Sequence, residues 1–295
     1  MLTTNPRYPY RAIGDRPDYR WPNGCGLAVY LALNLEVFAF GEGLGAELAP
    51  GGPQPDVLNY AWRDYGNRVG VWRMLEMLDA LQLPTSVLIN SDYYDACPGV
   101  AEAFRRRGDE FLGHGRTNSE RQGELDEAAE AKLIQEATAS IIREEGQHPG
   151  GWLGPWISES TVTPDLLHEA GYSFLLDWCM DDQPVWMTTR QGRILSVPYP
   201  QELNDIPAIV ARKMGGDAFA DMIVDQFDEM VEQSRDTPLV MGIALHPYIV
   251  GQPHRLRHLR RALAHIVARR EALFLTRAGA IASYIRSLPD AVIPA

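Results

Sequence analysis

Short apolar runs alternate with segments of helical period along most of this chain. Residues 26–33 are continuously apolar, as a strand buried on both faces must be, and residues 239–245 have the same character. Between these runs, the segment 71–81 repeats its valine and leucines at helical spacing. The strand and helix patterns alternate about seven times, which predicts a parallel sheet covered by helices, built either as a barrel or as a doubly wound sheet.

Polar side chains follow the carboxyl ends of several predicted strands. They are Asn34, Glu36, Asn90, Asp92, His114, Asp177 and His246. Barrel enzymes build their active sites at this face of the sheet. The glycine-rich turn with which a dinucleotide-binding fold holds phosphate is missing after the first strand. The pattern therefore favours a barrel hydrolase over a nucleotide-binding fold.

Composition narrows the classes of partner. The chain has 295 residues, and with 45% hydrophobic and 22% charged residues it is typical of a soluble globular protein. Its net charge of −12 argues against nucleic acid or an anionic membrane as a partner. The beginning of the sequence lacks the pattern of a signal peptide and no run is long enough to span a membrane, so we expect a cytoplasmic protein.

The domain organisation follows from the same pattern. Residues 1–22 are rich in Pro, Arg and Tyr and show no period, so we expect an extended arm over the body or over a neighbouring subunit. No linker divides the remainder, and residues 23–295 are predicted to form a single catalytic barrel. The three cysteines, Cys25, Cys97 and Cys179, lie far apart and predict neither a disulfide framework nor a zinc motif.

Several motifs together resemble the polysaccharide deacetylase superfamily. They are Asn34-Leu35-Glu36 after an apolar strand, Asp64-Tyr65-Gly66 with Arg68, Gly70, Trp72 and Arg73, then His114-Gly115, and Leu245-His246-Pro247. The chain is most similar to the branch that contains the metal-independent allantoinase and bacterial cyclic amide and imide hydrolases. This resemblance covers roughly residues 24–285. It implies a distorted (β/α)7 TIM-like barrel, and it implies a homo-oligomer, either a tetramer or a dimer.

The chain departs from the deacetylase pattern at the metal-binding positions. A typical deacetylase has an Asp-Asp pair and a His-x-x-x-His pair, where this chain has Asn34 with Glu36 and His114 with Asn118. Asn118 is a poor ligand for zinc, which prefers His, Cys and carboxylate. We therefore expect no cofactor. The alternative is zinc or another divalent metal held weakly by Glu36 and His114.

Amide hydrolysis needs a base for water, a stabiliser for the oxyanion and an acid for the leaving nitrogen. The candidates are Glu36 as the base, His246 as the acid and His114 as the group that polarises the carbonyl, although the sequence leaves base and acid open. The alternatives are purely structural roles, namely an ion pair of Glu36 with Arg68 or Arg73, and a capped strand end at His246.

The substrate is expected to be a small molecule. The aromatic residues Trp156 and Trp178 fall in strand-end loops, where their rings would suit a planar ring, although packing is the commoner role of any one tryptophan. The other candidate substrate-binding residues are Asn34, Arg68, Asn118, Asn204 and Asp205. By the family resemblance, Asn204 and Asp205 lie in a loop close to the substrate.

These expectations combine into one predicted function with two alternatives. The chain is predicted to be a hydrolase of non-peptide C–N bonds that opens a small cyclic amide, imide or ureide. One alternative is a metal-dependent deacetylase of an N-acetylated saccharide, an enzyme of carbohydrate metabolism. The other is a barrel that binds a small molecule without catalysis.

Overall fold

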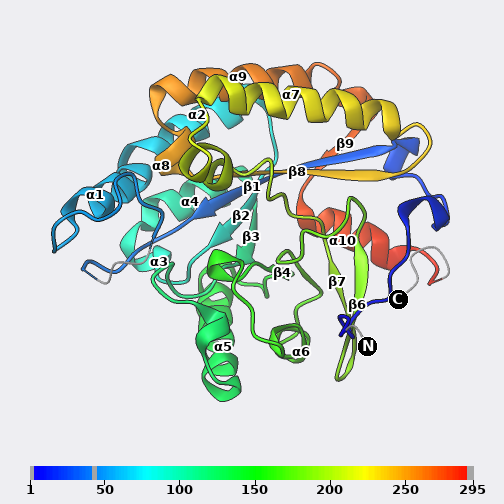
Figure 1. Ribbon diagram of the computed structural model, residues 1–295, viewed down its shortest axis with the longest axis horizontal. Helices are drawn as coiled ribbons and strands as arrows, with labels where there is room; N and C mark the ends of the chain where they lie inside the picture. The colour runs from blue at the N-terminus through cyan, green and yellow to red at the C-terminus, as the bar shows by residue number, and fades with distance from the viewer. Residues whose placement is uncertain (1–2, 42–44, 291–295) are drawn as a thin grey trace.

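The computed structural model describes residues 3–41 and 45–290 and has a mainly parallel sheet with helices packed around it (Figure 1). Residues 1–2, 42–44 and 291–295 lie outside the described residues; they belong to the predicted arm and to the predicted barrel. The strands are β1 Leu27–Leu35, β2 Ser86–Ile89, β3 Glu110–Gly113, β4 Gly151–Trp152, β5 Phe174–Leu175, β6 Val185–Thr189, β7 Gly192–Ser196, β8 Leu239–Leu245 and β9 Leu273–Thr276.

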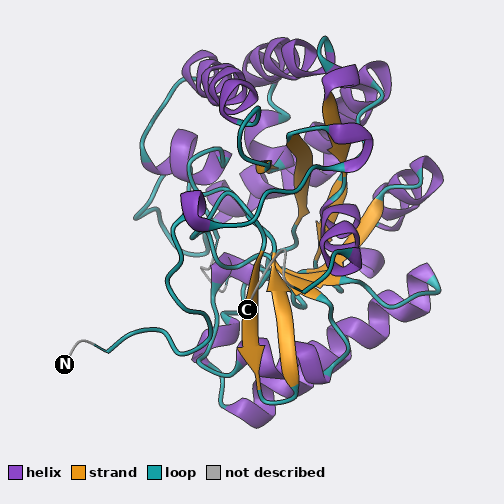
Figure 2. Ribbon diagram, turned by 90° about the vertical axis from the view of Figure 1, so that its right-hand side faces the viewer, coloured by secondary structure: helices purple, strands orange, loops and turns teal. Residues whose placement is uncertain are grey.

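The helices lie outside the strands, as Figure 2 shows. They are α1 Val57–Tyr65, α2 Val71–Leu81, α3 Tyr93–Ala96, α4 Pro98–Arg107, α5 Glu127–Glu145, α6 Thr163–Glu169, α7 Gly216–Gln233, α8 Pro247–Val250, α9 Pro253–Val267 and α10 Ala278–Ser287. No helix in the described parts of the chain has the length and apolar character that crossing a bilayer requires.

Strand β1 is the centre of the sheet. All nine of its residues are buried, which explains the unbroken apolar run in the sequence. It pairs in parallel with β8 along one edge and with β2 and β9 along the other. The carboxyl ends of β1, β2, β3 and β8 therefore meet at one face of the sheet. The α/β class predicted from the sequence is confirmed.

The sheet differs from a closed barrel at one place. The strands follow the order β6-β7-β5-β4-β3-β2-β1-β8, and β6 pairs antiparallel with β7. The β6–β7 hairpin and β8 stand at the two ends of this order. In the gap between them, the described residues form one isolated bridge, from Asn204 to Ala244. The chain segment 197–205 thus takes the place of a closing strand beside β8. The hairpin partner β6 was missed from the sequence because its run is short and carries no clear period.

A π-helical segment, Gly66–Gly70, joins α1 to α2 and presses against the chain that follows β8. A Cβ atom on Gly66 would lie 2.6 Å from the backbone nitrogen of Tyr248, and one on Gly70 would lie 2.2 Å from the carbonyl oxygen of Pro247. Only glycine allows the two backbones to approach so closely. Gly66 and Gly70 of the sequence motif that begins at Asp64 therefore have a structural role, which is to support the residues after His246.

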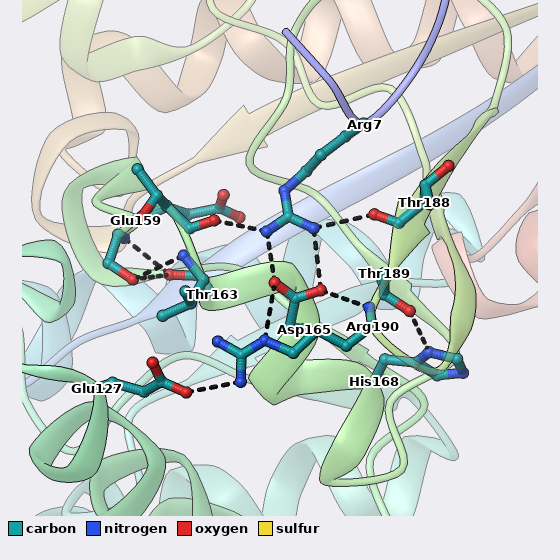
Figure 3. Close-up of polar contacts among 12 residues, drawn as sticks. Arg7, Glu127, Glu159, Thr163, Asp165, His168, Thr188, Thr189 and Arg190 are labelled. Atoms are coloured by element: carbon teal, nitrogen blue, oxygen red, sulfur yellow. Dashed lines mark hydrogen bonds and ion pairs between the residues drawn. The ribbon is translucent and has the colours of Figure 1, made fainter.

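The predicted arm is tied to its own chain at Arg7, as Figure 3 shows. The guanidinium donates two hydrogen bonds to the carboxylate of Asp165 at the start of α6, at 3.2 and 2.7 Å, and others to the carbonyl oxygens of Thr161 and Thr188. Arg190 also pairs with Asp165. This network fixes the arm between α6 and β6, so the arm packs on the body at this point. The homo-oligomer stays a prediction.

Candidate active site

Three strand ends bring the site together. Glu36 follows β1, His114 follows β3 and His246 follows β8. All three side chains are buried, and Glu36 Oε1 lies 3.5 Å from His114 Nε2 and 3.4 Å from His246 Nε2. The parallel register dictates this meeting, because Leu35 pairs with Ile89 of β2, Ile89 pairs with Gly113 of β3, and Leu33 pairs with Leu245 of β8.

Glu36 is 5% exposed and accepts hydrogen bonds on both carboxylate oxygens. Asn118 Nδ2 donates to Oε1 at 2.6 Å, and the Tyr248 hydroxyl donates to Oε2 at 3.2 Å. Burial alone would raise the pKa of Glu36, but the positive charge of His246 is the largest of the opposing influences, and the pKa is lowered to about 2. Glu36 is therefore a carboxylate throughout the neutral pH range.

His246 has the complementary electrostatics. Its Nδ1 atom donates to Asp205 Oδ1 at 2.6 Å, and its backbone N–H donates to Asp205 Oδ2 at 2.8 Å. Burial would lower the pKa of His246, but the carboxylates of Asp205 and Glu36 raise it to about 10. The ring is therefore an imidazolium at neutral pH, and its remaining N–H, on Nε2, points toward Glu36.

The tautomer of His114 is fixed by the backbone. Nδ1 lies 2.7 Å from the carbonyl oxygen of Leu153, so this nitrogen must carry a proton and donate it. In the neutral ring, Nε2 is then a hydrogen-bond acceptor. It is buried and forms no hydrogen bond with any described residue. The lone pair of Nε2 is available to a water molecule or a substrate.

The orientation of the Asn118 amide follows from a chain of hydrogen bonds. Asn90 Oδ1 accepts from the backbone N–H of Val37 at 2.9 Å, so Asn90 Nδ2 must be the donor to its other partners. One partner is the carbonyl oxygen of His114 and the other is Asn118 Oδ1, at 2.9 Å. The NH₂ group of Asn118 must therefore face Glu36.

This orientation does not fit a metal ion at the site. A metal would need a lone pair from position 118, whereas Asn118 presents N–H groups. His246 Nδ1 is engaged with Asp205. Across residues 3–41 and 45–290, no cluster of three or more His, Cys, Asp or Glu side chains could hold a metal ion. The alternative ligands Glu36 and His114 thus lack a third protein ligand.

A cavity of about 110 Å³ opens above these groups. Seven of the predicted site residues line it, namely Asn34, Glu36, His114, Asn118, Trp156, Asn204 and His246. One wall is a turn in which Trp156 and Ile157 both have positive φ, 65° and 53°, which is costly for a β-branched residue. The Trp156 indole N–H donates to the carbonyl oxygen of Asn118 at 2.8 Å and holds the turn in place.

Three predicted site residues lie elsewhere. Asp205 is buried behind His246 and contacts the ring instead of the cavity. Trp178 lines a neighbouring cavity, where its indole N–H donates to Glu159. The Arg68 side chain is 75% exposed and pairs with Asp64 on the outside of the helix, so its expected role in substrate binding is not supported by its position.

Sequence reasoning missed the two tyrosines whose hydroxyl groups reach the site residues of the cavity. Tyr248 lies two residues after His246, and this spacing could have indicated it, since it places both residues near the same strand end. Tyr199 lines the cavity from the closing segment, and its hydroxyl accepts a hydrogen bond from Asn34 Nδ2 at 3.2 Å. No periodic pattern marks that segment, so Tyr199 carried no signal of its own.

The fold and site define a class of protein: an α/β barrel of the hydrolase type, with a buried carboxylate between two histidines at the carboxyl ends of its strands. Comparisons with known proteins support this class. The chain is similar to the structure of Puue allantoinase, with 26% identity, a TM-score of 0.82 and coverage of 95% of this chain and 98% of that one. It is also similar to a probable polysaccharide deacetylase from Pseudomonas aeruginosa PAO1, with 26% identity, a TM-score of 0.84 and coverage of 96% and 99%.

A relative among curated proteins agrees. It is a Schizosaccharomyces pombe protein that bears the name of a polysaccharide deacetylase, 26% identical over 288 residues, with 87% of this chain and 89% of that protein covered. No protein-family model matches the chain. The resemblance to polysaccharide deacetylases and to the allantoinase branch is thus confirmed, and these relatives are consistent with the predicted hydrolase of C–N bonds other than peptide bonds.

Proposed function

We propose that this protein opens a small cyclic amide, imide or ureide by attack of water, without a metal ion. The observation that carries the proposal is the convergence of His114 Nε2 and His246 Nε2 on Glu36 Oε1, at 3.5 and 3.4 Å. A carboxylate, an imidazole lone pair and an imidazolium N–H face one point, where a reacting carbonyl group has its base and its acid within reach.

Glu36 is the base in this proposal. A water molecule that bridges Glu36 Oε1 and His114 Nε2 from the cavity side donates one hydrogen bond to each, which aims its oxygen at the ring carbonyl. As the C–O bond forms, the proton of the water passes to Glu36. His114 acts on the water rather than on the carbonyl group, because its Nδ1–H is committed to Leu153 and Nε2 is an acceptor.

His246 is the acid. Its Nε2–H stabilises the oxyanion of the tetrahedral intermediate and then protonates the ring nitrogen as the C–N bond breaks. The proton held by Glu36 returns to His246 across the 3.4 Å between them. One water is consumed, and the product is a single open chain with a new carboxyl group and a new N–H bond.

The cavity volume supports a small ring. The cavity has a volume of about 110 Å³. A five- or six-membered ring suits this space. Binding a polar heterocycle also needs hydrogen-bonding groups in the wall, and Asn34 and Asn204 provide amides there.

The test is a turnover panel on metal-stripped protein, offering succinimide, dihydrouracil, hydantoin, allantoin and N-acetylglucosamine oligomers, with and without zinc. We expect ring opening without metal. Glu36→Gln should lower the rate by roughly 10²- to 10⁴-fold and keep ligand binding, while the exposed control Glu76→Gln should match the wild type. Acetate release that requires zinc would establish the deacetylase instead. Ligand binding without turnover of any compound would favour the non-catalytic barrel.

A further inference from the structure

The proposed reaction leaves one polar group of the cavity unused. Among the described residues, two buried side-chain nitrogens without a hydrogen-bond partner belong to residues that line this cavity: His114 Nε2 and Gln201 Nε2. The first is assigned to the attacking water. Burying an amide N–H₂ group without a partner costs free energy, unless a ligand accepts the hydrogen bond.

Gln201 is held by the segment that closes the sheet. Leu203 is fully buried, and Asn204 forms the bridge to Ala244 of β8, two residues before His246. Asp205 then binds His246 directly. Gln201 therefore lies on the same short piece of chain that orients the acid, four residues before Asp205.

The hydrogen-bonding needs of a ring show what this amide can bind. The carbonyl under attack faces the N–H of His246. A simple lactam has no second carbonyl group, whereas an imide or ureide carries one on the other side of the ring nitrogen. That second oxygen needs a donor of its own, because an unpaired carbonyl in a desolvated cavity opposes binding.

We propose that Gln201 is a specificity-determining residue that donates a hydrogen bond from Nε2 to the second carbonyl of the ring. The preferred substrates are then cyclic imides and ureides with two carbonyl groups flanking a ring nitrogen, in preference to lactams with one. This inference rests on the proposed ring opening, and it narrows the class of ring that the site accepts.

The experiment compares the wild type, Gln201→Leu and Gln201→Glu on a matched pair, succinimide with two carbonyls and 2-pyrrolidinone with one. Turnover is measured for succinimide, and affinity for both compounds is measured in the Glu36→Gln background. We expect both Gln201 variants to lower kcat/KM for succinimide by roughly 10- to 100-fold and to weaken its binding, with a much smaller effect on 2-pyrrolidinone. The exposed control Gln147→Leu should behave as the wild type.

Each other outcome overturns the proposal. If Gln201→Glu keeps the wild-type preference, the residue accepts rather than donates. If both variants match the wild type, or weaken the binding of both compounds equally, Gln201 does not donate a hydrogen bond to the second carbonyl. If the wild type itself opens none of the cyclic amides, the proposed function fails and the inference falls with it, a result separate from an active wild type with indifferent variants.

Discussion

The carboxylate of Asp205 binds His246 twice, through the backbone N–H at 2.8 Å and through Nδ1 at 2.6 Å. The two contacts fix the position and the tautomer of the ring at once. They leave Nε2–H as the free end of the imidazolium, opposite Glu36. Asp205 thus serves as a positioning residue for the acid, from a place where it does not touch the cavity.

We expect Asp205→Asn to lower kcat/KM by roughly 10²- to 10⁴-fold and to change its pH dependence. The raised pKa of His246, about 10, keeps the acid protonated at neutral pH, and the protonated form is lost as the pH rises through that value. Without the Asp205 charge, the pKa falls and the alkaline limb of the pH–rate profile moves toward neutrality. An unshifted limb in a folded variant would contradict this role; exposed Asp236→Asn is the control.

The hydrogen bonding of Asn118 predicts how the site responds to zinc. Wild-type protein should show no rise in melting temperature with added zinc, because position 118 presents N–H groups to Glu36. Asn118→His would place a second imidazole beside His114 and Glu36, and we expect it to bind zinc. Melting curves with and without zinc measure the first expectation, and calorimetric titration measures zinc binding by both proteins. Stoichiometric tight binding by the wild type would show that our account of the site is wrong.

The close approach at Gly70 predicts a loss of stability on substitution. A Cβ atom there would lie 2.2 Å from the backbone carbonyl oxygen of Pro247, so the π segment or the chain after His246 must move. We expect Gly70→Ala to lower the free energy of unfolding by about 1–3 kcal/mol, measured by denaturant titration. Gly99→Ala is the matched control, because its Cβ atom would meet nothing within 4 Å. Equal stability of the two variants would contradict the prediction.

Two buried aspartates should respond to pH with opposite signs. Burial raises the pKa of Asp177 to about 7, so folding binds a proton and stability falls as the pH rises from about 4 to 7. Asp177→Asn keeps a side-chain oxygen that accepts the hydrogen bond from the Gly154 backbone N–H. Relative to the wild type, the variant should have a higher free energy of unfolding at pH 8, and the gain should be smaller at pH 5. The upper limit of the gain is on the order of 4 kcal/mol.

The contribution of Asp165 to stability has the opposite dependence on pH. Burial alone would raise its pKa, but the hydrogen bonds and charge of Arg7 lower it, so its contribution is present above the unfolded pKa near 4 and is lost as the pH falls below that. Asp165→Asn should destabilise the protein at neutral pH, and less so in acid. Melting curves of both variants from pH 3 to 8 test the pair; parallel shifts at every pH would contradict the assignment.

The sequence predicted the parts of the site that strands deliver. β1 and β8 are continuous apolar runs, and a residue at the end of such a strand can be assigned to the carboxyl face without knowing the rest of the fold. Glu36, His114 and His246 were found in this way. The same reasoning gave the α/β class, since alternation of strands and helices permits few architectures.

The positions of Arg68 and Trp178 were not predicted, and both residues lie where the regular spacing of a helix or strand is interrupted. The π segment Gly66–Gly70 inserts an extra residue into the helical turn, so the helical spacing no longer tells which side chains face inward. Arg68 lies in this segment and is exposed, whereas Arg63, five residues earlier, is buried over the ring of Phe38. β5 has only two residues, too few to set the direction of Trp178 beyond it.

Among the described residues, one isolated bridge, from Asn204 to Ala244, replaces a ladder between the closing segment and β8. Side chains supply further attachments: the Tyr30 hydroxyl donates to the carbonyl oxygen of Pro198, and Asn34 Nδ2 donates to the Tyr199 hydroxyl. The positions that tie this segment down are therefore few and identifiable. An engineer who varies residues 200–202 to change the ring that the site accepts should keep Tyr199, Leu203 and Asp205.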